Sequence, residues 1–180
     1  MKKDIREEIL QQLLDSVNKT VEELVGSIGF TPSQYEEVRE ALLKGVPLYQ
    51  IMGIADSVMD ARYAVAYRCY TTGNFADAEK IFQWLCSYNT GSSTYWMGLG
   101  ATRQALAEYD AAVDAYQYAA INSALEDPAP FYYSAMCFVK QKKGEEAKVA
   151  LQTILTLADP KNPEHIPFIA KAKAALEGLK

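Results

Sequence analysis

Histidine and cysteine are scarce in this chain, which has one histidine and three cysteines among 180 residues. His165 stands beside two prolines at an expected helix start, where a surface or capping role is the simplest interpretation. Cys69, Cys86 and Cys137 lack the spacing of metal ligands and are expected to be buried free thiols in helices. The chain also lacks a glycine-rich phosphate loop and the HExxH, GxSxG and Cys-x-x-Cys motifs. These absences predict a protein without enzymatic activity, bound metal or cofactor.

Basic residues are outnumbered, since 18 Lys and Arg face 23 Asp and Glu for a net charge of −5. This balance argues against binding to nucleic acid, which requires a basic surface. No apolar run reaches the ~18 residues of a membrane span, and the start MKKDIREEIL lacks the apolar core of a signal peptide. The sequence therefore predicts a cytoplasmic protein that does not insert into membranes.

What the chain does contain is an internal repeat of about 34 residues, a period typical of tetratricopeptide helix pairs. Each copy has a small residue in a first helix, a small residue in a second helix and a bulky residue four positions later. These positions are Ala66, Ala78 and Phe82, then Gly100, Ala112 and Tyr116, then Ala135, Ala147 and Leu151. Gly100 and Ala112 are expected to let two backbones approach, with Trp96 and Tyr116 filling the space beside them.

The predicted fold is all-α, with three tetratricopeptide helix pairs forming a short superhelical solenoid. Start and stop signals place the repeat helices near 57–71, 75–87, 92–106, 109–122, 128–141 and 145–157. A capping helix near 164–178 should lie on the last repeat through Ile166, Ile169, Ala172 and Leu176. The predicted domains are an N-terminal arm and link over 1–56, the repeats over 57–158 and the cap over 159–180.

The N-terminal arm begins with an amphipathic helix over residues 4–25, which the repeat pattern does not cover. Two glycines end it, a second helix follows to about Lys44, and Gly45-Val46-Pro47 breaks the chain before a short turn-rich link. The apolar stripe must dock on the repeats or on a second copy of the chain, and we favour the second copy. The dimerisation residues would be Ile5, Ile9, Leu13, Val17, Val21 and Leu24.

The unusual feature of the composition is its 12 tyrosines, most of them within 63–133. In stacked helix pairs the first helix of each pair lines a concave face, and tyrosine suits a peptide groove because it combines contact area with a hydroxyl. The alternative is that the aromatic residues pack between helices, which we favour for Phe82, Trp84, Trp96 and Tyr116. The helical register assigns the concave face to Tyr63, Tyr67, Tyr70, Met97, Ala101, Gln104, Tyr132, Met136 and Val139.

Three consecutive segments resemble the class II chaperones of bacterial type III secretion, the SycD/LcrH/IpgC family. The segments are GNFADAEKIFQWLCSY at 73–88, WMGLGATRQA at 96–105 and YDAAVDAYQYA at 109–119. The GLGA-x-x-QA run is specific, since the general repeat does not demand it. The resemblance covers roughly residues 20–160.

The resemblance implies a chaperone that holds a short linear motif of a hydrophobic translocator protein in its concave groove without using nucleotide. It also implies dimerisation through N-terminal helices. The family's groove aromatics fall on Tyr63, Phe75, Tyr88 and Tyr116, so Phe75, Tyr88 and Tyr116 join the predicted peptide-binding residues. Two other functions stay open: a general tetratricopeptide scaffold, and a secretion-linked regulator that binds a transcription factor.

The apolar stripe of the N-terminal arm predicts self-association. Burying one apolar side chain fully contributes roughly 1.5–3 kcal/mol, so six of them on one helix face should be covered by protein and not exposed to water. Sedimentation of the full chain and of a chain starting at Ser27 should show a dimer that is lost with the arm. Leu13→Asp and Val17→Asp should reproduce that loss by placing charges in the contact. If both the full and the shortened chain sediment as monomers at tens of micromolar, the arm folds onto its own repeats instead.

Overall fold

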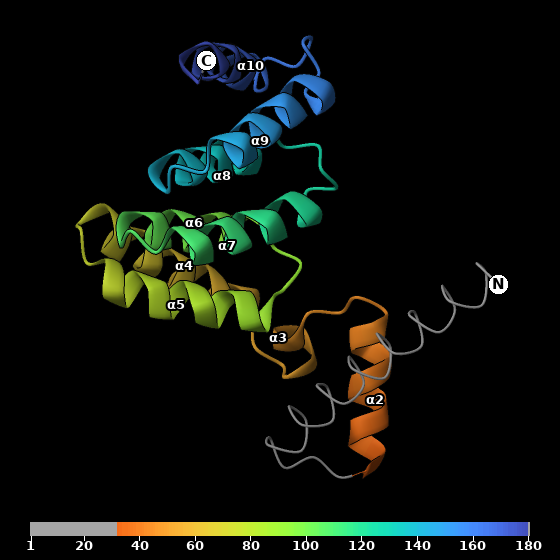
Figure 1. The fold of residues 1–180 in the computed structure, drawn as a ribbon. Coiled ribbons are helices and arrows are strands. Elements are labelled where there is room, and N and C mark those ends of the chain that lie inside the picture. Colours follow the sequence, from red (N-terminus) through yellow and green to blue (C-terminus); the bar gives the residue numbers. More distant parts are fainter. Residues whose placement is uncertain (1–31, 180) are drawn as a thin grey trace, which may run out of the picture. The chain divides into compact units, whose positions relative to one another are not determined.

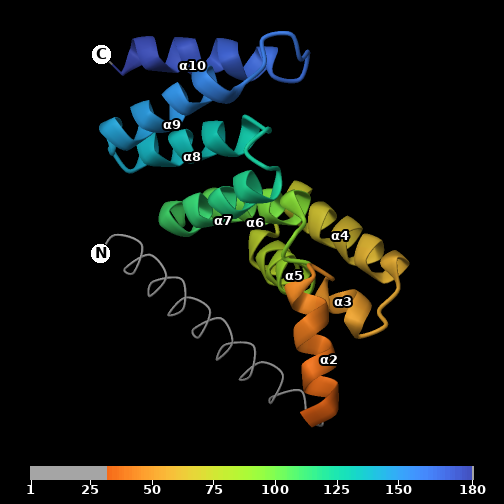
Figure 2. The same cartoon turned by 90° about the vertical axis from the view of Figure 1, so that its right-hand side faces the viewer.

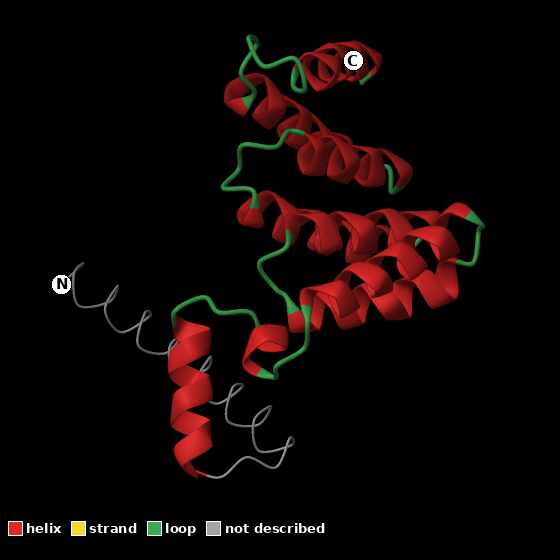
Figure 3. Ribbon diagram, turned by 180° about the vertical axis from the view of Figure 1, so that it is seen from behind, coloured by secondary structure: helices red, strands yellow, loops and turns green. Residues whose placement is uncertain are grey.

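The computed structural model describes residues 32–179, and all of its regular secondary structure within this range is helical (Figure 3). The chain divides after Met52 into two compact units. The predicted dimerisation residues, from Ile5 to Leu24, lie outside the described residues.

The described part of the first unit contains α2 (Pro32–Leu43) and the short α3 (Leu48–Ile51). The predicted break between them is confirmed. Gly45 has a φ of +80°, a left-handed conformation that glycine adopts without a steric penalty. The Gly45 N–H donates to the carbonyl of Leu42 at 2.9 Å, which closes the end of α2.

The described part of the second unit contains three helix pairs and a final helix, which Figures 1 and 2 show from two sides. Each helix packs mainly on its neighbours in the sequence, so the pairs stack in chain order and α10 lies on α9. The all-α tetratricopeptide fold is therefore confirmed, with the repeat helices close to their predicted ranges. The helices are α4 (Asp56–Thr71), α5 (Phe75–Tyr88), α6 (Ser93–Ala105), α7 (Tyr109–Asn122), α8 (Ala129–Lys140), α9 (Gly144–Leu157) and α10 (Ile166–Gly178).

The three repeat positions are buried in every copy, which explains why their residue types recur. The first small residue is Ala66, Gly100 or Ala135, the second is Ala78, Ala112 or Ala147, and the bulky residue is Phe82, Tyr116 or Leu151. Buried interiors are close-packed, so each bulky side chain requires a small residue on the helix that faces it.

The missing side chain of Gly100 makes room for the ring of Tyr116, as expected from the repeat pattern. A Cβ at Gly100 would lie 2.5 Å from Cε1 of Tyr116. A Cβ at Gly98, two residues earlier in α6, would collide with the ring of Phe82. Two glycines of α6 thus admit aromatic rings from α5 and α7.

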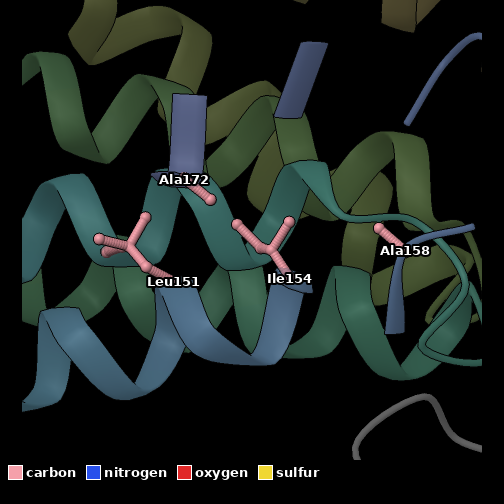
Figure 4. Packing of buried hydrophobic residues seen from close by; sticks show 5 residues of the cluster. Leu151, Ile154, Ala158 and Ala172 are labelled. Atoms are coloured by element: carbon pink, nitrogen blue, oxygen red, sulfur yellow. The ribbon is translucent and has the colours of Figure 1, made fainter. Parts of the chain in front are cut away.

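The last helix closes the stack through a cluster of buried apolar residues from α8, α9 and α10 (Figure 4). Ile169 and Leu176 of α10 pack against this cluster, as predicted. Ile166 does not follow the prediction, because its side chain is 51% exposed at the first turn of α10. The cluster consists of Ala135, Leu151, Ile154, Ala158 and Ala172.

The turn inside each helix pair has the same backbone geometry, with one residue in the left-handed region. That residue is Gly73 at φ +80°, Ala107 at +62° and Lys142 at +61°. In each turn the next N–H reaches back to a carbonyl five residues earlier, as from Asn74 to Cys69 at 2.8 Å. This is the Schellman pattern that ends many helices, and it favours glycine at the left-handed position. Two of the three turns therefore carry a side chain where the backbone disfavours one.

Gly100→Ala should destabilise the protein by about 1–3 kcal/mol, because the added methyl overpacks the contact with Tyr116. Thermal and urea melts followed by helical circular dichroism measure the loss. Gly144→Ala is the control, since a Cβ there meets nothing within 4 Å. Equal melting curves for Gly100→Ala and the native chain would contradict this packing.

Substitutions at the left-handed position of two turns should change the free energy of unfolding in opposite directions, because one introduces glycine there and the other removes it. Ala107→Gly should stabilise by about 0.5–1 kcal/mol, and Gly73→Ala should destabilise by about 1 kcal/mol. No atom lies within 4 Å of a Cβ at Gly73, so backbone strain alone carries that effect. Urea melts of both variants provide the measurement, and shifts of the same sign would rule out the strain explanation.

Candidate functional site

A cleft in the second unit has a volume of about 490 Å³ and is lined mostly by the first helix of each pair. Helices α4, α6 and α8 provide its walls, while one ring each from α5 and α7 reaches in from the second helices. The lining residues are Tyr63, Tyr67, Tyr70, Phe82, Thr94, Met97, Gly98, Ala101, Gln104, Ala105, Tyr116 and Tyr133.

The aromatic wall of the cleft follows from the spacing of α4 and from the glycines of α6. Tyr63, Tyr67 and Tyr70 are four and three residues apart, which places them on one face of a helix. The ring of Tyr63 meets Phe82 edge to face at 6.1 Å between centroids and lies 6.3 Å from Tyr67. Offset and edge-to-face pairs of this kind fix the orientation of the rings. Tyr67 stays 55% exposed and is available for contact.

The most buried of the polar residues that line the cleft is Tyr116, which is only 1% exposed. Its hydroxyl donates a hydrogen bond of 2.7 Å to Oε1 of Gln104. Burial raises the pKa of Tyr116 well above its usual value, with smaller contributions from Cys137, Tyr70 and Tyr133. Tyr116 is therefore a neutral donor at any physiological pH.

Among the described residues, none that lines the cleft is charged. The nearest charged side chain in the sequence of α6 is Arg103, which turns instead toward α5 and α7. Its Nε donates to Oε1 of Glu79 at 3.0 Å and its Nη1 to the carbonyl of Ala111 at 3.2 Å. Both side chains of the ion pair are only about one-fifth exposed, at 20% and 19%. The pair joins α5 to α6 without placing a charge in the cleft.

The cysteines and the histidine have structural surroundings. Burial raises the pKa of Cys86 to about 12, although Arg103 partly opposes the shift, and burial raises that of Cys137 to about 11. Both are therefore thiols, not nucleophilic thiolates, at neutral pH. His165 directly precedes α10, and its Nδ1 accepts from the N–H of Asp159 at 3.0 Å. His165 occupies the N-cap position of α10, as the prediction of a surface or capping role allows, but its side chain makes no hydrogen bond to the N–H groups of that helix.

Within residues 32–179 no three or more His, Cys, Asp or Glu side chains gather closely enough to hold a metal ion. None of the described helices combines the length and the apolar character needed to cross a bilayer.

Known proteins are similar to this chain both in fold and in the sequence of the helices that line the cleft. The tetratricopeptide repeat family model matches residues 59–89 and 93–121, which are the first two helix pairs. The low calcium response locus protein H of Yersinia pseudotuberculosis is 32% identical over 148 residues, which cover 82% of this chain and 87% of that protein. The chain belongs to the LcrH/SycD family of type III secretion chaperones.

Solved structures of the family superpose on this chain. A type III secretion complex from Aeromonas hydrophila has a TM-score of 0.74 at 27% identity and covers 80% of this chain and 95% of that one. SycD of Yersinia enterocolitica, in complex with a peptide of the translocator YopD, has a TM-score of 0.65 at 29% identity. That match covers 70% of this chain and 95% of SycD. The resemblance found in the three sequence segments is thereby confirmed.

Six of the ten predicted peptide-binding residues line the cleft together, namely Tyr63, Tyr67, Tyr70, Met97, Gln104 and Tyr116. Phe75 and Tyr88 lie elsewhere. The ring of Phe75 meets Tyr70 edge to face at 5.6 Å, and Tyr88 stacks on Trp84 at 4.0 Å. Tyr116 both packs between helices and contributes to the cleft, so the two roles weighed for it are compatible.

Tyr132 and Met136 also lie outside the lining, because they pack against the C-terminal cluster. The ring of Tyr132 meets Phe168 of α10 edge to face at 5.8 Å. The next residue, Tyr133, lines the cleft and stacks on Tyr116 at 5.7 Å. One residue turns a helix by about 100°, so a register that is off by one is enough to replace Tyr133 by Tyr132 in the predicted cleft.

The sequence prediction also missed Phe82, Thr94, Gly98 and Ala105 as lining residues. The pairing of Gly98 with Phe82 repeats that of Gly100 with Tyr116, a bulky residue of a second helix facing a glycine of α6. A search of the sequence for glycines of one helix that face bulky residues of the adjacent helix would have placed Phe82 in the cleft.

Proposed function

We propose that this chain is a cytoplasmic chaperone of type III secretion that holds an extended segment of a hydrophobic translocator in its tyrosine-lined cleft. The observation that carries the proposal is the uncharged aromatic cleft on the first helices of the pairs. A relative with the same fold, SycD, was solved with a translocator peptide, which supports the same class of ligand here.

The cleft suits an extended apolar segment better than a charged one. Its tyrosine rings and Met97 provide apolar contact, and burial of apolar surface contributes about 25 cal/mol per Å². The cost of ordering the segment and of association offsets much of this gain, which leaves affinities in the micromolar to nanomolar range. A charged side chain would lose its hydration in the cleft without gaining an opposite charge.

The proposed action rests on binding energy alone, with no catalytic step. While a segment of the translocator is held, its membrane-seeking parts are kept from aggregating or inserting before secretion. Release requires only that another partner compete for the segment, and no nucleotide is needed.

Co-expression with the type III translocators of the same host tests the proposal. A translocator should copurify with the full chain in soluble form and aggregate without it. Peptides of 12 residues that tile the copurified translocator should then reveal one segment that binds the full chain, measured by fluorescence anisotropy. If no translocator copurifies and no tile binds, the proposed function is wrong.

The cleft prediction is that Tyr63→Ala with Tyr67→Ala weakens binding of that peptide 10-fold or more, about 1.4 kcal/mol, because the aromatic wall is lost. Anisotropy titrations give the affinity, and circular dichroism verifies that the variant is folded. Tyr118→Ala is a matched control for Tyr67, since Tyr118 is 53% exposed on α7 outside the cleft. Unchanged binding in the folded double variant would place the peptide elsewhere.

A further inference from the structure

Tyr116 is held in place on two sides within the cleft. On one side its ring fills the space left by Gly100, where a Cβ would come within 2.5 Å of the ring. On the other side it stacks on Tyr133 with 26° between the ring planes. The hydroxyl at the end of this buried ring therefore has a fixed position, and it has a single proton to donate.

That proton fixes the orientation of the Gln104 side chain. The Tyr116 hydroxyl donates to Oε1 of Gln104, and no other acceptor for it is recorded in the described part of the chain. The oxygen end of the amide is thus engaged, while its Nε2 has two N–H groups and no hydrogen bond recorded within residues 32–179. Gln104 lines the cleft and is only partly buried, so these donors are within reach of a ligand.

We propose that Nε2 of Gln104 donates a hydrogen bond to a main-chain carbonyl of the bound segment, and that Tyr116 is the positioning residue that holds the amide in this orientation. This inference rests on the proposed function, because it names how the same cleft recognises its ligand.

A main-chain carbonyl is the ligand group that this donor fits best. An extended segment has a carbonyl at every residue, and one that enters an apolar cleft loses its water. A buried acceptor without a partner is costly, so a donor fixed at that place favours binding whatever the side chain of the residue. A carboxylate would call for a cation, and none of the residues of 32–179 that line the cleft is a cation. The other tyrosine hydroxyls of the cleft can rotate to donate or accept, whereas the Gln104 amide, whose oxygen accepts from Tyr116, presents N–H groups to the ligand.

Substitutions at Gln104 test the donor, using the fluorescein-labelled translocator tile that binds the full chain most tightly. Gln104→Leu should weaken binding about 5- to 10-fold, since the donor is lost while the apolar bulk remains. Gln104→Glu should weaken it at least as much, because it keeps an acceptor for Tyr116 but faces the carbonyl with an oxygen. Gln152→Leu and Gln152→Glu are matched controls on an exposed part of α9 outside the cleft and should leave binding unchanged.

Tyr116→Phe tests the positioning role, because it removes the hydroxyl and keeps the ring. Binding should weaken about 3-fold in a variant that is fully folded at the temperature of the titration. A role for Tyr116 in stability alone would lower its melting temperature and leave the affinity unchanged. Combining Tyr116→Phe with Gln104→Leu should give no further loss beyond Gln104→Leu, since the hydroxyl acts through the amide.

Ester substitution in the peptide identifies the acceptor, because an ester carbonyl accepts hydrogen bonds more weakly than an amide carbonyl. Moving one ester along the tile should reveal a position that weakens binding to the native chain several-fold and has little effect on Gln104→Leu. If no ester position couples to Gln104, or if both Gln104 variants bind as tightly as the native chain, the inference is overturned while the cleft proposal stands. If no tile binds the native chain, the proposed function fails and this inference fails with it.

Discussion

The exchange of bulk between neighbouring helices is the constraint on which the cleft depends. Two glycines of α6 take rings from opposite sides, Phe82 from α5 at Gly98 and Tyr116 from α7 at Gly100. A side chain at either glycine would collide with a ring. The stacking of the first two helix pairs and the positions of the two rings therefore depend on each other. The same contacts that build the fold therefore bring two aromatic rings into the cleft.

Charge is distributed so that this cleft stays neutral. Arg103 directly precedes the cleft residue Gln104 in the helix, yet its guanidinium pairs with Glu79 and the carbonyl of Ala111. The ion pair joins α5 to α6, while the cleft keeps amide and hydroxyl groups as its polar atoms. This separation suits a ligand that is apolar in its side chains and polar only in its backbone, as an extended segment of a membrane-seeking protein is.

The helices could be read from the sequence because their signals are local or periodic. Capping residues, prolines and glycines mark the helix ends, and the recurrence of Ala66, Gly100 and Ala135 shows how the pairs repeat. The groove residues predicted from the sequence differ from the structure in the third helix pair, where the repeat is least regular. The sequence placed Tyr132 in the groove, whereas α8 turns Tyr133 toward Tyr116 and packs Tyr132 on Phe168. The added helix α10 draws that face of α8 into its own core, and the repeat pattern contains no information about α10.

By itself the sequence determined the helices, their pairing, the family and the aromatic face of α4, since each of these depends on spacing within one helix or on a repeated period. The tertiary structure decided which rings share a cleft, which glycine meets which ring, and that the Gln104 amide is held by Tyr116. Those features depend on the rotation of one helix against the next. A small rotation changes the partner of a side chain without changing the pattern of the sequence, so only the packed structure distinguishes the alternatives.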